Sequence, residues 1–161
     1  MTKLFRKILV PFDFSAPATH ALQVAADLAT EHRGTLEVLH VLPPFYSGVG
    51  FPTQAEIAWT PPPEMVRDLQ TRLAQDVAKA LGRRKGIASC RAVLGDPVQS
   101  ILAAARRADA IVMATLGRSG LAHLVMGSIA ERVVRHSPVP VLTVRPNAAR
   151  RRTSVARARR R

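Results

Sequence analysis

The feature that most restricts the fold of this chain is a set of five short apolar runs, rich in β-branched residues, that alternate with stretches of helical periodicity. The runs are residues 7–11, 36–41, 90–94, 110–114 and 139–144. The first, fourth and fifth are almost continuously hydrophobic, which is typical of parallel strands covered on both faces. Alternation of strands with helices predicts right-handed crossovers. The sequence therefore predicts the α/β class, with one doubly wound, Rossmann-like sheet of five parallel strands flanked by helices.

Helices are predicted between the runs from apolar spacing and from capping residues. Ser15 is placed to cap the first helix, which Gly34 would stop, and the second helix ends near Gly82. The third opens at Asp96, a capping residue that is followed by proline. Ser128 opens a Ser-x-x-Glu capping box before the last run.

Length and charge predict one domain and a tail. The chain has 161 residues and a formal net charge of +13. A single domain is predicted over residues 1–146, followed by an arginine-rich disordered tail, 147–161, whose seven arginines supply more than half of the excess charge. No apolar run reaches the roughly 20 residues that span a bilayer. The first residues do not suggest a signal peptide, and Cys90 is the one cysteine. We expect a cytoplasmic protein without a membrane association.

Residues 42–63 form a long, proline-rich connection that holds four of the seven aromatic side chains. Connections of this length are usually functional or disordered, and aromatic residues argue mildly against plain disorder. Two hypotheses stay open: a flap over a ligand or partner surface, and an excursion without a role.

Open α/β sheets bind ligands beyond the carboxyl ends of their strands, where the winding reverses. Two segments occupy that position, residues 11–15 after the first run and residues 114–128 after the fourth. The second holds three glycines after position 115 and ends on a capped helix, so backbone N–H groups and the helix dipole favour a phosphate there. A tight turn and an ordinary cap are the alternatives. The P-loop pattern and the dinucleotide pattern G-x-G-x-x-G are both absent.

The runs Gly-Arg-Ser-Gly-Leu at 117–121 and Met-Gly-Ser-Ile-Ala-Glu-Arg-Val at 126–133 make the chain resemble the universal stress protein family, in its ATP-binding branch. That branch carries Gly, two residues, Gly, nine residues, Gly, then Ser or Thr. Gly117, Gly127 and Ser128 fit the last three positions, whereas Ala114 stands at the first. Alanine is the mildest change from glycine, and we expect weaker nucleotide binding rather than its loss.

The resemblance implies a site for ATP, with Mg²⁺ held mainly by phosphates and water. Asp13 would lie beside the base and ribose, backbone groups around Val41 would recognise the adenine, and the backbone at 127–129 would hold phosphates and ribose. The implied site residues are Pro11, Asp13, Val41, Met113, Ala114, Gly117, Gly127, Ser128 and Ile129.

The resemblance also implies a homodimer in which the last strand, 139–144, pairs with its symmetry mate. An apolar strand at a sheet edge needs covering in any case. We find no catalytic set in the sequence and expect no enzyme, although slow ATP hydrolysis stays open.

Three functional hypotheses follow. The first is a stress-response protein that binds ATP and signals through nucleotide occupancy. The second is a nucleotide-free dimeric adaptor of the same fold that has lost ATP binding, with Ala114 as its signature. In the third, the arginine tail binds nucleic acid weakly and without sequence specificity, the alternative being a solvated tail.

Overall fold

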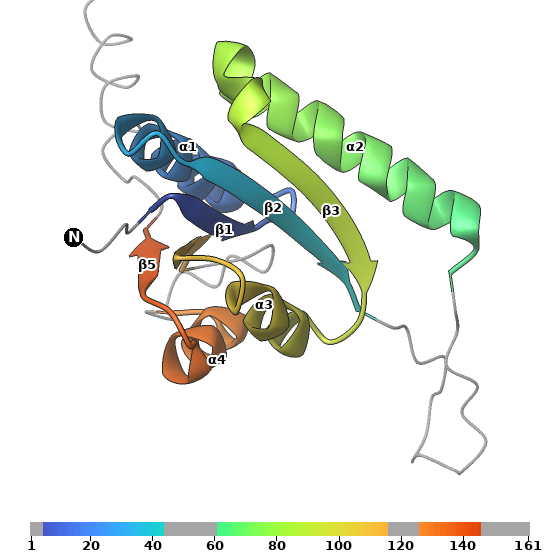
Figure 1. Cartoon of the computed structure of the whole chain (residues 1–161). Helices are drawn as coiled ribbons and strands as arrows, with labels where there is room; N and C mark the ends of the chain where they lie inside the picture. Colours follow the sequence, from blue (N-terminus) through green and yellow to red (C-terminus); the bar gives the residue numbers. More distant parts are fainter. Residues whose placement is uncertain (1–4, 44–60, 116–125, 146–161) are drawn as a thin grey trace, which may run out of the picture.

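The computed structural model describes residues 5–43, 61–115 and 126–145. In chain order the elements are β1 (Lys7–Pro11), α1 (Ala16–Glu31), β2 (Thr35–Leu42), α2 (Pro63–Leu81), the 3₁₀ helix η1 (Gly82–Ile87), β3 (Ala88–Leu94), α3 (Pro97–Ala105), β4 (Ala110–Ala114), α4 (Ser128–His136) and β5 (Val141–Val144). All five strands pair in parallel, in the order β3-β2-β1-β4-β5 (Figure 1). The predicted class, strand number and strand direction are confirmed.

Helices cover the two faces of the sheet unequally. The long helices α1 and α2 lie on one face, and the shorter α3 and α4 lie on the other (Figure 1). Because successive side chains of a strand point to opposite faces, Ile8 and Val10 join the core under α1 and α2, while Leu9 joins the core under α3 and α4. All three are fully buried, as the continuous apolar runs predicted.

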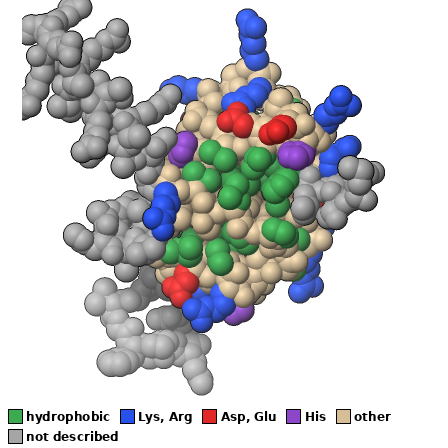
Figure 2. Space-filling model, turned by 90° about the vertical axis from the view of Figure 1, so that its left-hand side faces the viewer, with side chains coloured by type: hydrophobic (Ala, Val, Ile, Leu, Met, Phe, Trp, Pro, Cys, Tyr) green, Lys and Arg blue, Asp and Glu red, His purple; other side chains and the backbone are tan. Residues whose placement is uncertain are grey.

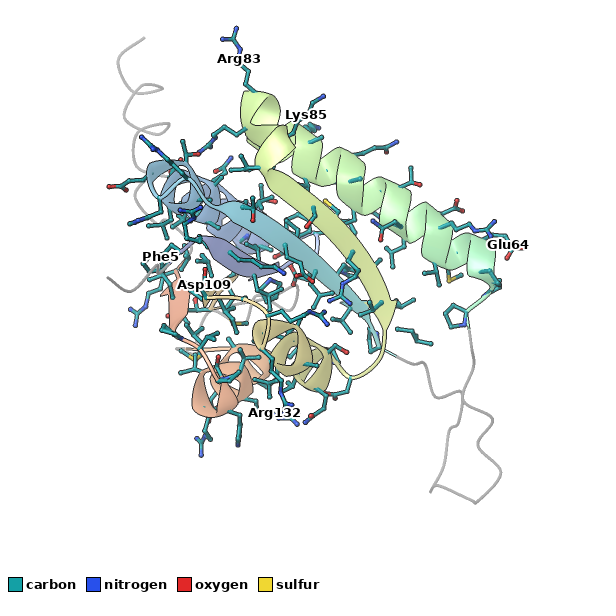
Figure 3. All side chains as sticks on the ribbon, in the orientation of Figure 1. Phe5, Glu64, Arg83, Lys85, Asp109 and Arg132 are labelled. Atoms are coloured by element: carbon teal, nitrogen blue, oxygen red, sulfur yellow. The ribbon has the colours of Figure 1, made fainter. Side chains whose placement is uncertain are left out.

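Two predicted helix caps are confirmed. The Ser15 hydroxyl accepts a hydrogen bond from the Ala18 amide at 3.2 Å, and the Asp96 carboxylate accepts one from the Gln99 amide at 2.8 Å. The ends of α2 also agree with the helix dipole, since Glu64 stands in its first turn and Arg83 and Lys85 lie beyond its last turn (Figure 3).

The end of α1 agrees in part with the prediction that Gly34 stops the helix, because α1 ends at Glu31 and the Gly34 amide donates to the Ala29 carbonyl at 2.7 Å. The residue with left-handed backbone is Arg33, at φ 52°, whereas no such angle is found at Gly34. Gly34 is also needed for close packing. A Cβ atom added to Gly34 would lie 2.3 Å from the Phe5 carbonyl oxygen and 2.8 Å from that of Arg6. The backbone entering β2 therefore touches the backbone entering β1.

One edge of the sheet is covered by a side chain. The Gln70 amide of α2 donates to the Cys90 carbonyl at 2.8 Å and accepts from the Ala92 amide at 2.7 Å. Those two backbone groups of β3 are the ones that a single residue of a parallel sixth strand would bind. Gln70 thus takes the place of one residue of a neighbouring strand.

Three strands differ from their predicted limits, and β2 exceeds its predicted run by one residue at each end. β3 begins at Ala88, two residues before the predicted start, because its first residues are less apolar and carry no period-two signal. The final strand begins at Val141 rather than at residue 139, because Pro138 and Pro140 cannot donate to a ladder, although the Pro140 carbonyl still accepts from the Ile111 amide.

The start of β1 is fastened to the start of β4 over a long sequence separation. The Lys7 amide donates to the Asp109 carboxylate at 2.8 Å, and the Asp109 amide donates to the Lys7 carbonyl at 2.8 Å. Asp109 lies beside the entry to β1, near Phe5 (Figure 3). The two central strands are therefore joined at their amino ends by a reciprocal pair of hydrogen bonds.

Candidate ligand-binding edge

The switch point of the sheet lies between β1 and β4. From β1 the chain proceeds outward through β2 to β3, and it then returns to the other side of β1 to form β4 and β5. β1 and β4 are paired directly, with Ile8 opposite Ala110 and Leu9 opposite Ile111. The loops that follow these two strands therefore diverge. The space between them, outside the carboxyl ends of β1 and β4, is where open α/β sheets bind ligands.

Asp13 lies in the turn that leaves β1 at this edge. Its carboxylate oxygen Oδ1 accepts a hydrogen bond from the Ser15 amide at 3.0 Å, while the Ser15 hydroxyl caps α1. Pro11, the last residue of β1, and Asp13 are both half-buried. One carboxylate oxygen is thus used to shape the turn.

Phe14 gives this turn an uncommon backbone. Its φ is 65°, in the left-handed region that bulky residues rarely adopt. The Phe14 ring lies against the rings of Phe12 and His40, with centroids 5.5 Å and 4.7 Å away. Sequence reasoning did not identify this cluster, because spacing along the chain cannot show that His40 of β2 meets a turn after β1.

The end of β4 supplies the other wall of the edge. Met113 is buried, and Ala114 is half-buried and opposite Val144 in the ladder. Ala114 is not among the described residues with positive φ, so its backbone does not require glycine. The departure from the glycine pattern therefore adds only a methyl group.

Thr115 ties β4 to the helix that follows. Its amide donates to the Val144 carbonyl at 3.0 Å, and its carbonyl accepts from the Gly127 amide at 2.6 Å. Gly127 consequently lies next to the end of β4. Thr115 is buried and was missed in the sequence, where a lone threonine after a strand carries no distinctive signal.

The start of α4 corrects the predicted capping box. The N-cap is Gly127, and no described side chain makes a capping hydrogen bond there. Ser128 is instead the first helical residue, one position too late to cap, and the Glu131 carboxylate binds Arg135 at 2.9 Å. Ser128 and Ile129 are exposed. The first N–H groups of α4 therefore have no capping side chain among the described residues.

The predicted site residues that the structure describes all lie toward the carboxyl edge of the sheet. Val41 stands one residue before the end of β2 and is half-buried on the α3 and α4 side. Gly117 lies outside the described residues, as do most of the connection 42–63 and the tail 147–161. The residues gathered at this edge are Pro11, Asp13, Val41, Met113, Ala114, Gly127, Ser128 and Ile129.

Residues 5–43, 61–115 and 126–145 contain no group of three or more His, Cys, Asp or Glu side chains that could hold a metal ion. No helix in that part of the chain is long and apolar enough to cross a membrane.

The sheet order, the switch point and the uncapped helix end define an open, doubly wound α/β protein with a candidate ligand edge. Residues 4–145 match the universal stress protein family, and the chain belongs to that family. A universal stress protein of Methanocaldococcus jannaschii is 32% identical over 150 residues, covering 88% of this chain and 83% of the relative. One of Thermus aquaticus is 34% identical over 148 residues, covering 88% of this chain and all of the relative.

Solved structures agree with the fold. A universal stress protein from Lactobacillus plantarum has a TM-score of 0.65 at 24% identity, covering 88% of this chain and 99% of its own. A universal stress protein in complex with cAMP has a TM-score of 0.58 at 24% identity, covering 88% and 98%. A family member from Arabidopsis thaliana with AMP bound has a TM-score of 0.57 at 20% identity, covering 88% and 92%.

Proposed function

We propose that this protein binds an adenine nucleotide, ATP in the first place, at the carboxyl edge between β1 and β4. The observation that carries the proposal is the start of α4. Ser15 and Asp96 cap α1 and α3 with their side chains, whereas α2 and α4 have no side-chain cap among the described residues, and of these two α4 is the one whose start is bonded to the end of β4. Its first N–H groups and its positive dipole end are left for an anion such as a phosphate.

Asp13 supplies the complementary end of the proposed site. A carboxylate cannot hold phosphates, but it can accept hydrogen bonds from ribose hydroxyls. Asp13 follows β1, Gly127 lies against the end of β4, and the two strands are neighbours. In our proposal the ribose lies beside Asp13, the adenine lies toward Val41, and the phosphates lie at 127–129.

The family and its solved members support an adenine nucleotide as the ligand. Two members of the same fold hold cAMP and AMP respectively. Ala114 does not argue against binding, because its backbone lies in a regular strand. We propose ATP as the physiological ligand, with Mg²⁺ arriving on its phosphates.

We propose a binding protein rather than an enzyme, acting in stress signalling in the cytoplasm. Nucleotide can shift a balance between two conformations only if it binds one of them more tightly. The proposal is therefore that occupancy of the edge, not chemical turnover, is the signal. A nucleotide-free adaptor of the same fold is the alternative.

The nucleotide proposal is tested by the content of the freshly purified protein and by calorimetric titration with ATP, ADP, AMP and cAMP. We expect Asp13→Ala to weaken binding at least about tenfold, since it removes a charged acceptor. Asp68→Ala, on the exposed side of α2, is the matched control. A protein that is purified empty and ignores millimolar Mg·ATP contradicts the proposal.

Ala114→Gly distinguishes the adaptor alternative. The regular strand backbone at Ala114 predicts little gain in affinity from glycine. A large gain in ATP affinity would instead mean that the methyl group had closed the site, as the adaptor hypothesis requires.

We also propose a homodimer through β5. Pro140 and Val144 use their carbonyls to bind β4, so the backbone groups of Val141 and Thr143 point to the open edge. An antiparallel two-fold pairing would join Val141 to the mate's Thr143 and bring the two copies of Leu142 together at the axis. Leu142 is 41% exposed, and hydrophobic side chains gather at the centre of the surface on this side of the molecule (Figure 2).

A further inference from the structure

The turn that carries Asp13 must be held by its surroundings. Phe14 has its φ at 65°. A bulky L-residue stays in this region only where neighbouring contacts enforce it. Because Phe14 stands between Asp13 and Ser15, and the Ser15 amide binds the Asp13 carboxylate at 3.0 Å, the direction of that carboxylate depends on the backbone at Phe14.

β2 holds one side of the turn. The Phe12 amide donates to the Leu39 carbonyl at 2.9 Å, and His40 Nδ1 lies 2.7 Å from the Phe12 carbonyl, to which it can only donate. The Phe14 ring then rests on the His40 ring, with centroids 4.7 Å apart and planes inclined at 59°. Leu39 and His40 are both residues of β2, so these contacts fix the turn to the sheet.

On the other side of the turn, the Arg72 side chain of α2 contacts Phe14, which also packs against the core cluster under α1 and α2. The guanidinium carbon of Arg72 lies over the Phe14 ring, 4.7 Å from its centroid, which is cation–π geometry. The Arg72 side chain is 66% exposed, and its partner within the helix, Asp76, lies 3.9 Å away. Arg72 can therefore be changed without opening the core.

We propose that Arg72 is a positioning residue for Asp13. By holding the Phe14 ring against His40, Arg72 keeps the turn in its left-handed conformation and aims the Asp13 carboxylate into the ligand edge. The inference rests on the proposed nucleotide function and deepens it, because the contact makes the affinity of the site depend on where α2 lies.

The first test compares the wild type with Arg72→Met, which keeps an unbranched side-chain stem and removes the charged guanidinium. We expect AMP and ATP to bind about two- to fivefold more weakly, the usual worth of an exposed cation–π contact. Arg72→Lys keeps the cation and should restore most of the affinity. Arg67→Met, at an exposed position of the same helix, is the matched control and should bind as the wild type does.

The second test is a double-mutant cycle with Asp13→Ala. If Arg72 acts through Asp13, Arg72→Met has no further effect on nucleotide affinity once Asp13 is absent. An equal loss in both backgrounds would overturn the inference, and so would wild-type affinity in Arg72→Met.

The third test needs no nucleotide. Hydrogen exchange of the Ser15 amide reports the bond to Asp13 directly. We expect Arg72→Met to speed exchange at Ser15 and to leave the central amides of α1 unchanged. Unchanged exchange at Ser15 overturns the inference. If the wild-type protein binds no nucleotide while Ser15 exchange still responds to Arg72→Met, the proposed function fails and the positioning of Asp13 by Arg72 stands.

Discussion

The two edges of the sheet end in different ways. At β3, the Gln70 side chain of α2 fills the place of one residue of a missing strand with hydrogen bonds of 2.8 and 2.7 Å. At β5, the outward backbone groups of Val141 and Thr143 make no hydrogen bond within the described residues. An exposed strand edge invites another chain to pair with it. We propose that self-association is directed to β5, because Gln70 already binds two backbone groups of the other edge.

The largest expected effect is at the open edge. Thr143→Pro removes an N–H group that binds nothing within the described part of the chain, so the fold should survive. Each proposed dimer would lose two hydrogen bonds and gain a steric conflict, and we expect dimer affinity to fall roughly a hundredfold. Sedimentation or light scattering across a dilution series measures it.

Thr143→Ala is the control, because it keeps the N–H group and should leave the dimer unchanged. A Thr143→Pro protein that still sediments as the wild-type dimer would place the dimer interface elsewhere. It would contradict the proposal that β5 is the edge at which two copies pair.

A smaller effect is expected at the closed edge. Gln70→Ala leaves the Cys90 carbonyl and the Ala92 amide without their partner, which should lower the free energy of unfolding by about 1–3 kcal/mol. The opened edge should also promote species larger than the wild type in concentrated solution. Denaturant titration and light scattering measure the two effects.

Gln75→Ala, at an exposed position of α2, controls for a change of helix composition. If Gln70→Ala and Gln75→Ala were equally stable and equally monodisperse, the hydrogen bonds of Gln70 would be incidental to edge protection.

The smallest effect concerns the Cys90 thiol on β3, which reports how tightly that edge is closed. Burial raises the pKa of Cys90 above its ordinary value. Since the thiolate is the reactive form, alkylation by iodoacetamide should be slow at neutral pH and should still be accelerating above pH 9. The unfolded thiol ionises at lower pH, so this group makes a small contribution to stability that is lost as the pH rises above the unfolded pKa.

Gln70→Ala should speed the alkylation of Cys90 several-fold by loosening β3. Equal rates in the two proteins would mean that α2 closes the edge by packing alone.

Much of the fold was predictable because its signals are local. The buried strands β1 and β4 are continuous apolar runs in the sequence. Ser15 and Asp96 cap helices by accepting hydrogen bonds from amides close by in the chain. The errors arose where a residue depends on distant partners. The sequence predicts Gly34 near the end of α1, but it cannot show that the Phe5 and Arg6 carbonyl groups leave no room for a Cβ atom there.

The candidate site divides in the same way. Asp13 and Gly127 could be placed at one edge because the ends of parallel strands share an edge. Ser128 could not be placed correctly, because a capping box at Ser128 and a helix that begins one residue earlier have the same sequence pattern. Phe14, His40 and Arg72 come from three elements, and their contact follows from packing rather than from spacing.

The reciprocal hydrogen bonds between Lys7 and Asp109 span 102 positions of the chain. β1 is made early, but its partner β4 emerges from the ribosome only after most of the domain has been synthesised. Closing such a long loop carries an entropic cost that local helices do not carry, so the pairing of β1 with β4 is expected late in folding. The edge between these strands therefore takes shape only in a nearly complete chain, and a nascent or truncated copy that lacks β4 would have no site at all.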